Sequence, residues 1–310
     1  MLSVIWNITG RCIWDCAFCV MDAGMGCSRA ELSYAEKQTA IEHLRGVDCR
    51  VDLSGGEVML DREGHLPLIA KLSHMLGKDN LGISCSGVNI GEEEAGFLAR
   101  FVSEVEMTMD ARPGCSFPQR PKGYHTVAGK ATDLLVANGV RVGLQTVLTR
   151  VHYGDPGLLV GLYDWLAAHG VSVWSLLRFF PTGRGAAYPE LALSEKENRL
   201  LVDRAKLLCR SGGGPKLDVH YLLPGTDKDE HCRCVRKSIG VLPGGDVTSC
   251  FWGLDGSGDI AGSRFLLGNI ARTPLAEILE GENARRWARY YGCCPLGDDG
   301  GDGDYDVFAA

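Results

Sequence analysis

The sequence predicts an α/β protein, a partial (β/α)6 TIM-like barrel followed by a small C-terminal appendage. Over residues 1–185, short β-branched runs alternate with helical segments, which is typical of parallel βαβ units. Several helical segments end in Gly or Asn-Gly just before the next strand. A cysteine-rich loop follows the first strand, at the strand ends where barrels carry their functional groups. These observations favour a barrel over an open sheet.

The expected elements follow in order along the chain. The strands are runs of near-continuous hydrophobicity, which predicts that both of their faces are covered, and they span residues 2–8, 50–53, 81–85, 104–109, 140–148 and 171–180. The helices between them have amphipathic spacing and span residues 32–45, 62–76, 92–102, 126–138 and 156–168.

Four segments are expected along the chain. The barrel occupies residues 1–190, a connecting helix and linker with the run SGGGP occupies 191–215, the appendage occupies 216–296, and an acidic flexible tail occupies 297–310. The appendage contains an expected strand at 216–222, a hairpin through 243–245 and an amphipathic helix at 274–287. It is too short for an independent core, so we expect it to pack on the barrel.

Charge and composition exclude several classes of protein. The net charge of the 310 residues is -7, and five aspartates of the tail account for most of it, so the body is nearly neutral and we expect no nucleic-acid partner. Neither a membrane span nor a secretory signal is evident, so we expect a cytoplasmic protein. Thirteen cysteines in such a protein favour metal binding or catalysis over disulfides.

The first cysteine motif is CxxxCxxC, formed by Cys12, Cys16 and Cys19 in the loop after the first strand. Three thiolates on one short loop can converge on a soft metal. Three ligands leave a fourth iron of a cubane open to a substrate or cofactor. Chance occurrence and a zinc site are the alternatives, although zinc would require a fourth ligand nearby.

This motif resembles the signature of the radical S-adenosylmethionine (radical SAM) superfamily, and Phe18 matches the aromatic residue that usually precedes the last cysteine. Ser54-Gly55-Gly56-Glu57 follows the second strand as the GGE motif of that family does. The resemblance implies a [4Fe-4S] cluster whose unique iron binds the amino and carboxylate groups of S-adenosylmethionine. Glycines permit close backbone approach, and Glu57 offers an acceptor for an ammonium group.

Softer matches follow the later strands in the order expected for the family. They are Cys85-Ser86-Gly87, Thr108-Met109-Asp110, Gln145, and the run PTGRG at residues 181–185. The first two depart from the usual Thr-Asn-Gly and Ser-Leu-Asp. The resemblance implies that the cofactor is bound by Phe18, Gly55, Gly56, Glu57, Ser86, Thr108, Gln145 and Gly183.

A second cysteine group lies in the appendage. Cys234 and Cys250 flank Gly245, which suits the tip of a hairpin, and Cys293 and Cys294 follow the last helix. This spacing resembles the auxiliary-cluster domain of SPASM and shorter twitch enzymes, which implies a second [4Fe-4S] cluster. Cys232 is a fifth candidate ligand. The cluster has at most four ligand positions, so which four of the five cysteines bind it stays open. A fourth iron open to substrate and a zinc ribbon-like staple are the alternatives.

Three further residues are expected near the mouth of the barrel as catalytic candidates. Arg178 interrupts an apolar strand, where a charge is costly without a carboxylate or phosphate partner; an internal ion pair is the alternative. Three roles stay open for Asp110, namely binding the cofactor, capping a turn, and accepting a proton from the substrate. Cys115 follows the fourth strand, where a thiol can donate a hydrogen atom, although a structural role is the simpler interpretation.

The resemblance implies an oxidoreductase that cleaves S-adenosylmethionine to a 5'-deoxyadenosyl radical and abstracts hydrogen from its substrate. The auxiliary cluster would accept an electron in a net oxidation, and an external one-electron donor such as flavodoxin or ferredoxin would be a partner. Because no segment precedes the first strand to bind a leader peptide, we expect a small polar, sugar-like or aminocyclitol-like substrate from natural-product biosynthesis. Cross-linking, thioether formation or cyclisation of a ribosomally made peptide is the alternative. A non-catalytic iron–sulfur or zinc protein is the alternative of another class.

Overall fold

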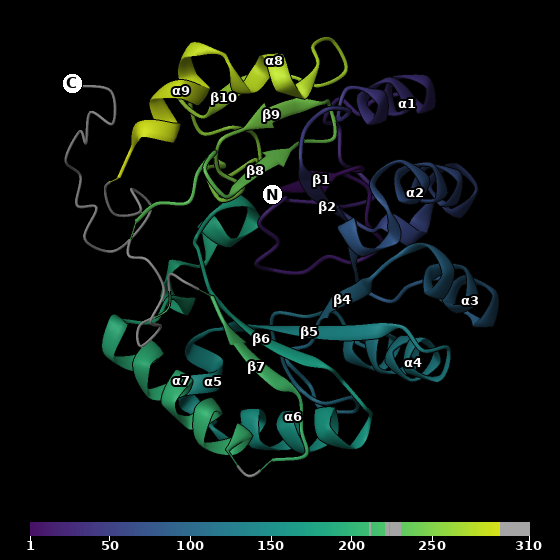
Figure 1. Ribbon diagram of the computed structural model, residues 1–310. Coiled ribbons are helices and arrows are strands. Elements are labelled where there is room, and N and C mark those ends of the chain that lie inside the picture. The colour runs from purple at the N-terminus through teal and green to yellow at the C-terminus, as the bar shows by residue number, and fades with distance from the viewer. Residues whose placement is uncertain (211, 221–222, 224–230, 292–310) are drawn as a thin grey trace.

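A computed structural model of the chain describes residues 1–210, 212–220, 223 and 231–291 (Figure 1). Over these residues the chain forms one open, curved sheet of ten strands with helices along its outer side. The fold confirms the expected α/β partial barrel with a C-terminal appendage. Among the described helices, none is long and apolar enough to cross a membrane.

The strands of the sheet are mostly parallel. Among the described residues they are β1 (Leu2–Asn7), β2 (Cys49–Ser54), β3 (Leu81–Cys85), β4 (Glu104–Thr108), β5 (Arg141–Leu148), β6 (Val173–Arg178), β7 (Lys216–Val219), β8 (Ser238–Val241), β9 (Asp246–Thr248) and β10 (Leu266–Asn269). Their order is β10-β9-β8-β1-β2-β3-β4-β5-β6-β7, and β9 runs antiparallel to both β8 and β10. The six βα units expected from the alternation are therefore neighbours in sequence order.

The helices begin where side chains can cap them. They are α1 (Tyr34–Glu42), α2 (Arg62–Leu76), α3 (Glu92–Phe101), α4 (Tyr124–Ala137), α5 (Arg150–Gly154), α6 (Gly157–Ala168), α7 (Glu195–Cys209), α8 (Leu275–Leu279) and α9 (Glu282–Arg289). Ser33 and Ser194 form capping boxes with Glu36 and Glu197, and Asp61 accepts from the Gly64 N–H at the start of α2. These local signals explain why most helices were predictable to within two residues.

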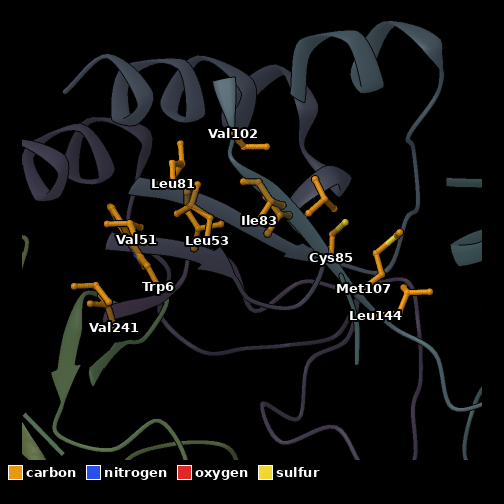
Figure 2. Packing of buried hydrophobic residues seen from close by; sticks show 14 of the residues in the cluster. Trp6, Val51, Leu53, Leu81, Ile83, Cys85, Val102, Met107, Leu144 and Val241 are labelled. Carbon is orange, nitrogen blue, oxygen red and sulfur yellow. The ribbon is translucent and has the colours of Figure 1, made fainter. Parts of the chain in front are cut away.

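The two faces of the barrel strands differ sharply. Apolar residues such as Trp6, Val51, Leu53 and Ile83 are buried between the strands and the outer helices (Figure 2). Polar residues alternate with them and point inward, where they line a cavity. The inner face therefore borders a ligand-sized space, lined by polar and apolar side chains, in place of a second layer of helices.

The appendage is joined to the barrel through its strands. β7, at the start of the expected segment 216–296, pairs with β6, and β8 pairs with β1 in parallel. The expected hairpin is confirmed as β8–β9, with Gly245 at φ +86° in its turn. The expected helix 274–287 is instead two helices, because Gly281 adopts an extended conformation between α8 and α9. Neither α5 nor β10 was expected.

Candidate functional site

The loop between β1 and α1, residues 8–33, carries the first cysteine motif and is called the three-cysteine loop below. Cys12, Cys16 and Cys19 all line one cavity, with Cys12 and Cys16 buried and Cys19 half-buried. The backbone N–H groups of Trp14 and Ala23 donate to Cys12 Sγ and Cys19 Sγ, both at 3.4 Å. Burial raises the pKa of the Cys12 thiol to about 12, against the effect of the Trp14 N–H. Burial therefore disfavours the thiolate form, which a bound cation would stabilise.

The GGE segment after β2 lies directly against the three-cysteine loop. The Gly56 N–H donates to Thr9 O and the Glu57 N–H to Arg11 O, both at 2.8 Å. A Cβ at Gly56 would lie 2.2 Å from Arg11 O, and one at Gly55, where φ is +144°, would lie 2.5 Å from Thr9 O. Only glycines permit this approach of two backbones, so both residues help to shape the loop that carries the cysteines.

Glu57 is fully buried and connects three loops. Its Oε1 accepts from the Met59 N–H at 2.9 Å, and its Oε2 accepts from the Ser86 N–H at 2.8 Å and from the Ser86 hydroxyl. Trp14 Nε1 in turn donates to Ser86 Oγ at 2.8 Å. Burial raises the pKa of the Glu57 carboxyl, against these hydrogen bonds. Recognition of an ammonium group by Glu57 stays a prediction, and the side chain is not among those lining the cavity.

A cavity of about 400 Å³ lies inside the curved sheet, below the three-cysteine loop. The cavity brings together six of the residues expected to bind the cofactor, namely Phe18, Gly55, Gly56, Ser86, Thr108 and Gln145. Its volume is in the range of small-molecule sites. The order of these residues after successive strands is what allowed the sequence to anticipate them, because parallel strands end at one edge of a sheet.

Gly183 and Arg184 hold the three-cysteine loop from the side of β6. A Cβ at Gly183, where φ is +56°, would lie 2.1 Å from Val20 O, and Gly183 is not among the residues lining the cavity. Arg184 donates to Cys16 O at 2.9 Å, to Ala23 O at 2.7 Å and to the Asp22 carboxylate at 2.9 Å. The run PTGRG therefore positions the cysteines through their backbone. Its arginine was not expected to do so.

The deep end of the cavity is polar. Ser3, Asp52, Ser84, Glu106 and Gln145 line it, and Gln145 Nε2 donates to Glu106 Oε2 at 2.8 Å. Burial, followed by the negative charge of Asp52, raises the pKa of the Glu106 carboxyl to about 7. This end of the cavity therefore holds a carboxyl group that changes its charge near neutral pH.

Replacing Glu106 by glutamine is expected to stabilise the protein at pH 8 and to change little at pH 5. Because the folded-state pKa is raised, the stability associated with this carboxyl is lost as pH rises from about 4.5 to about 7. The glutamine avoids a loss of about 3 kcal/mol, equivalent to a rise of several degrees in Tm. Thermal unfolding at both pH values measures the difference. The exposed Glu277→Gln is the control, and an equal shift of Glu106→Gln at both pH values would contradict the assignment.

Asp110 is completely buried at the end of β4 and forms an ion pair. Arg120 Nε donates to Asp110 Oδ2 at 2.6 Å, and the Val147 N–H donates to Oδ1 at 3.0 Å. Burial favours the neutral acid, but Arg120 and neighbouring histidines hold the pKa of this carboxyl well below its usual range. Asp110 does not line the cavity. Its proposed role in catalysis is untested, and this carboxylate would act on the cavity through Arg120.

Arg178 and Cys115 have different surroundings. Arg178 lines the cavity, and its guanidinium carbon lies 5.7 Å from the centre of the Phe180 ring. Cys115 is half-buried and packs with an apolar cluster that contains Phe117 and Phe179; Phe179 also lines the cavity, whereas Cys115 does not. The structure thus brings Arg178 to the candidate site and leaves Cys115 beside it. Their catalytic roles stay predictions.

Sequence reasoning missed Arg120 as a site residue. It lies in the irregular segment between β4 and α4, among prolines and glycines that indicate a surface loop. The structure nevertheless buries it in the wall of the cavity. A weak signal was present, since an arginine so close to Phe117 and Tyr124 can form cation–π contacts, but spacing alone does not show which rings it meets.

The second cysteine group lies near the β8–β9 hairpin. Cys232 and Cys234 are buried, Cys250 is half-buried, and the Cys234 thiol hydrogen-bonds to the sulfurs of both of the others. Cys293 and Cys294 lie outside the described residues. In the described part of the chain, no three His, Cys, Asp or Glu side chains converge on a position for a single metal ion. The ligands of an iron–sulfur cluster need not meet at one point, because its irons occupy separate corners.

The appendage also contributes to the cavity. Phe251 and Trp252, which directly follow Cys250, line it together with Phe180 and His220. The ring centres of Trp252 and Phe180 are 5.0 Å apart, and those of Trp252 and His220 are 6.0 Å apart. One wall of the cavity therefore comes from the segment that carries the second cysteine group.

The donor set fits iron–sulfur clusters and S-adenosylmethionine. Three thiols of one loop would hold a [4Fe-4S] cluster by three of its irons, and the fourth would be open to the cofactor. The hydroxyls of Ser86 and Thr108 and the aromatic rings of the cavity suit a ligand with a polar ribose and an apolar base. Cys232, Cys234 and Cys250 supply three sulfurs for a second cluster.

Comparison with known proteins agrees with this geometry. Residues 232–296 match the SPASM family, described as an iron-sulfur cluster-binding domain. The chain is 27% identical over 203 residues to Fe-coproporphyrin III synthase of Methanosarcina barkeri, which covers 64% of this chain and 49% of the synthase. The chain thus spans about half the length of that relative. It is 24% identical over 303 residues to PqqA peptide cyclase of Xanthomonas oryzae, covering 94% of this chain and 77% of the cyclase.

Two solved structures share the fold over most of the chain. The structure of anSMEcpe with bound AdoMet has a TM-score of 0.68 at 15% identity, and covers 93% of this chain and 83% of that one. SuiB of Streptococcus suis has a TM-score of 0.70 at 13% identity, and covers 93% of this chain and 68% of that one. The matched domain, this fold and the cysteine motifs agree with the resemblance to radical SAM proteins that carry a SPASM domain, and they support S-adenosylmethionine and iron–sulfur clusters as the cofactors.

Proposed function

We propose that this protein is a radical SAM enzyme that carries out a net oxidation of a substrate bound in the cavity of the barrel. The observation that carries the proposal is that the three-cysteine loop and the segment after Cys250 line the same cavity. Cys12, Cys16 and Cys19 would hold a cluster that could supply the electron for reductive cleavage of S-adenosylmethionine, and the second cysteine group would hold one suited to accept an electron from the substrate. This pairing favours an oxidoreductase.

The residues of the chain bind, orient and exclude water. Trp14, Ser86 and Glu57 connect the ends of β2 and β3 to the three-cysteine loop, so these segments form one rigid rim. Phe180 and Trp252 form an apolar wall that excludes water from the reacting carbon. We propose that Arg178 orients an anionic or hydroxyl group of the substrate at this wall, since it lines the same cavity.

A peptide side chain is the substrate class we propose first. The support is the match with PqqA peptide cyclase over 94% of the chain. SuiB has also been solved bound to the precursor peptide SuiA. A cavity of about 400 Å³ that must also hold S-adenosylmethionine leaves room for one side chain rather than a whole peptide. The remainder of such a substrate would lie outside the cavity.

A small polar substrate, sugar-like or aminocyclitol-like, is the second candidate. The observation that favours it is the polar deep end of the cavity, where Asp52, Glu106 and Gln145 offer several hydrogen-bonding groups. Hydroxyl and amino groups on a small ring would be recognised by such a set. The two candidates share the need for a polar group on the part of the substrate that enters the barrel.

The proposed function is tested with anaerobically reconstituted protein, S-adenosylmethionine and a reductant. We expect about eight irons per chain for two [4Fe-4S] clusters, formation of 5'-deoxyadenosine, and transfer of deuterium to it from a labelled substrate. Label from deuterated peptides supports the first substrate class, and label from deuterated aminocyclitols supports the second. About four irons with one zinc would contradict the second cluster. Failure to cleave S-adenosylmethionine would support a non-catalytic iron–sulfur or zinc-binding protein.

An external one-electron donor is the partner that this function requires. Flavodoxin and ferredoxin are the proposed classes, because the cleavage of S-adenosylmethionine consumes an electron that the protein must receive from outside. Support for either class would come from 5'-deoxyadenosine formation when the protein donor replaces the chemical reductant in the same assay.

A further inference from the structure

Arg120 is a buried cation held in a fixed position. Its side chain is 8% exposed, and its Nε donates to the fully buried Asp110. Its guanidinium carbon lies 4.4 Å from the centre of the Phe18 ring and 4.7 Å from that of the Tyr124 ring. Two aromatic faces and one carboxylate therefore fix the plane of the guanidinium group, which is the arrangement that arginine favours over lysine.

Arg120 is also tied to the three-cysteine loop. The Ala17 N–H, next to Cys16, donates to the carbonyl oxygen of Gln119, next to Arg120, at 3.1 Å. This backbone bond holds the two segments side by side. Both Arg120 and Cys16 line the cavity, so the guanidinium charge and the Cys16 sulfur border the same space.

Asp110 alone does not account for this placement. Asp110 occupies the Nε side of the guanidinium, and the group has further N–H donors in a fixed fork. Burying a charged group is costly unless its donors are used. Cys16 lines the same cavity, on the segment that the Ala17–Gln119 bond holds beside Arg120. Asp110 thus orients the arginine, and the arginine presents its positive charge to the cavity that Cys16 also lines.

We propose that Arg120, positioned by Asp110, raises the reduction potential of the cluster held by the three-cysteine loop. A buried cation beside a cluster stabilises the reduced cluster, which carries one more negative charge than the oxidised cluster. Burial weakens the screening of such a charge, so its effect on the cluster is larger than at an exposed site. Arg120 is therefore a positioning and tuning residue that acts through its charge. This inference rests on the proposed function, because it requires the first cluster.

The test is a redox titration of reconstituted protein followed by electron paramagnetic resonance. The first cluster is identified by the change in its spectrum when S-adenosylmethionine is added, since only a cluster with an open iron binds it. For Arg120→Met, we expect the midpoint potential of the first cluster to fall by about 59 mV. For a one-electron couple, this shift lowers the ratio of reduced to oxidised cluster at the wild-type midpoint tenfold. Arg120→Lys keeps the charge and is expected to restore part of this loss.

Two further variants separate tuning from a structural effect. Arg50→Met removes another arginine of the barrel, one paired with Asp52 and Glu104, and is expected to leave the potential unchanged. Asp110→Asn removes the compensating negative charge and is expected to shift the potential upward. A potential in Arg120→Met and Asp110→Asn equal to that of Arg50→Met would overturn the inference. A wild-type protein without a cluster that responds to S-adenosylmethionine would instead overturn the proposed function.

Discussion

Replacing Cys16 by alanine is expected to abolish formation of 5'-deoxyadenosine, with a loss of at least about a thousandfold in rate. Cys16 is buried in the wall of the cavity, and the backbone of its loop is held by Arg184. No other sulfur of that loop can replace it without moving a backbone that is hydrogen-bonded at several points. Without the third thiolate the first cluster has no complete protein ligand set.

The measurement is 5'-deoxyadenosine formed per chain under reducing conditions, together with iron content. Cys209→Ala is the matched control, because Cys209 is half-buried at the end of α7 and does not line the cavity. The control is expected to retain both iron and activity. Product formation by Cys16→Ala at the rate of Cys209→Ala would defeat the assignment of the first cluster.

Replacing Gly56 by alanine is expected to have the second largest effect, because it displaces the loop that carries the cysteines. The added Cβ would lie 2.2 Å from Arg11 O and 2.6 Å from Arg11 C, which are backbone atoms that cannot rotate away. Relief requires separation of the hydrogen bonds that Gly56 and Glu57 donate to Thr9 and Arg11. We expect a loss of about 2–4 kcal/mol in the free energy of unfolding and loss of most iron from the first cluster.

Denaturant unfolding and iron analysis after reconstitution test this expectation. Gly26→Ala is the control within the same loop, since no atom lies within 4 Å of the Cβ it would add. If Gly56→Ala retains the iron content and stability of Gly26→Ala, the close contact between the GGE segment and the three-cysteine loop is not required for cluster binding.

Much of the fold was predictable because its signals are local. The helix at Arg62–Leu76 is delimited by the cap Asp61 and by Gly77, and the hairpin turn is marked by consecutive glycines. The predictions from sequence were wrong where one local pattern is compatible with two structures. Gly281 divides the expected helix 274–287, and many of the inward-facing side chains of the strands are polar although the strands contain apolar runs.

The candidate site was predictable where residues follow strand ends. Gly55, Ser86, Thr108 and Gln145 belong to different strands or their loops, yet parallel alignment brings them to one cavity. Arg120 was not predictable, because its burial depends on Asp110 and two aromatic rings that only tertiary packing assembles. The contribution of Trp252 was hidden for the same reason, since it comes from the far end of the chain.

The sequence by itself determined the barrel type, the two cysteine groups and the family resemblance, because cysteine spacing and strand–helix alternation are properties of short stretches of chain. Only the tertiary structure decided which charges face the first group. Arg184 reaches Cys16 across 168 positions, and Glu57 reaches Ser86 across 29. Such contacts depend on the curvature of the sheet and on packing between loops, so the same local sequence permits them without specifying them.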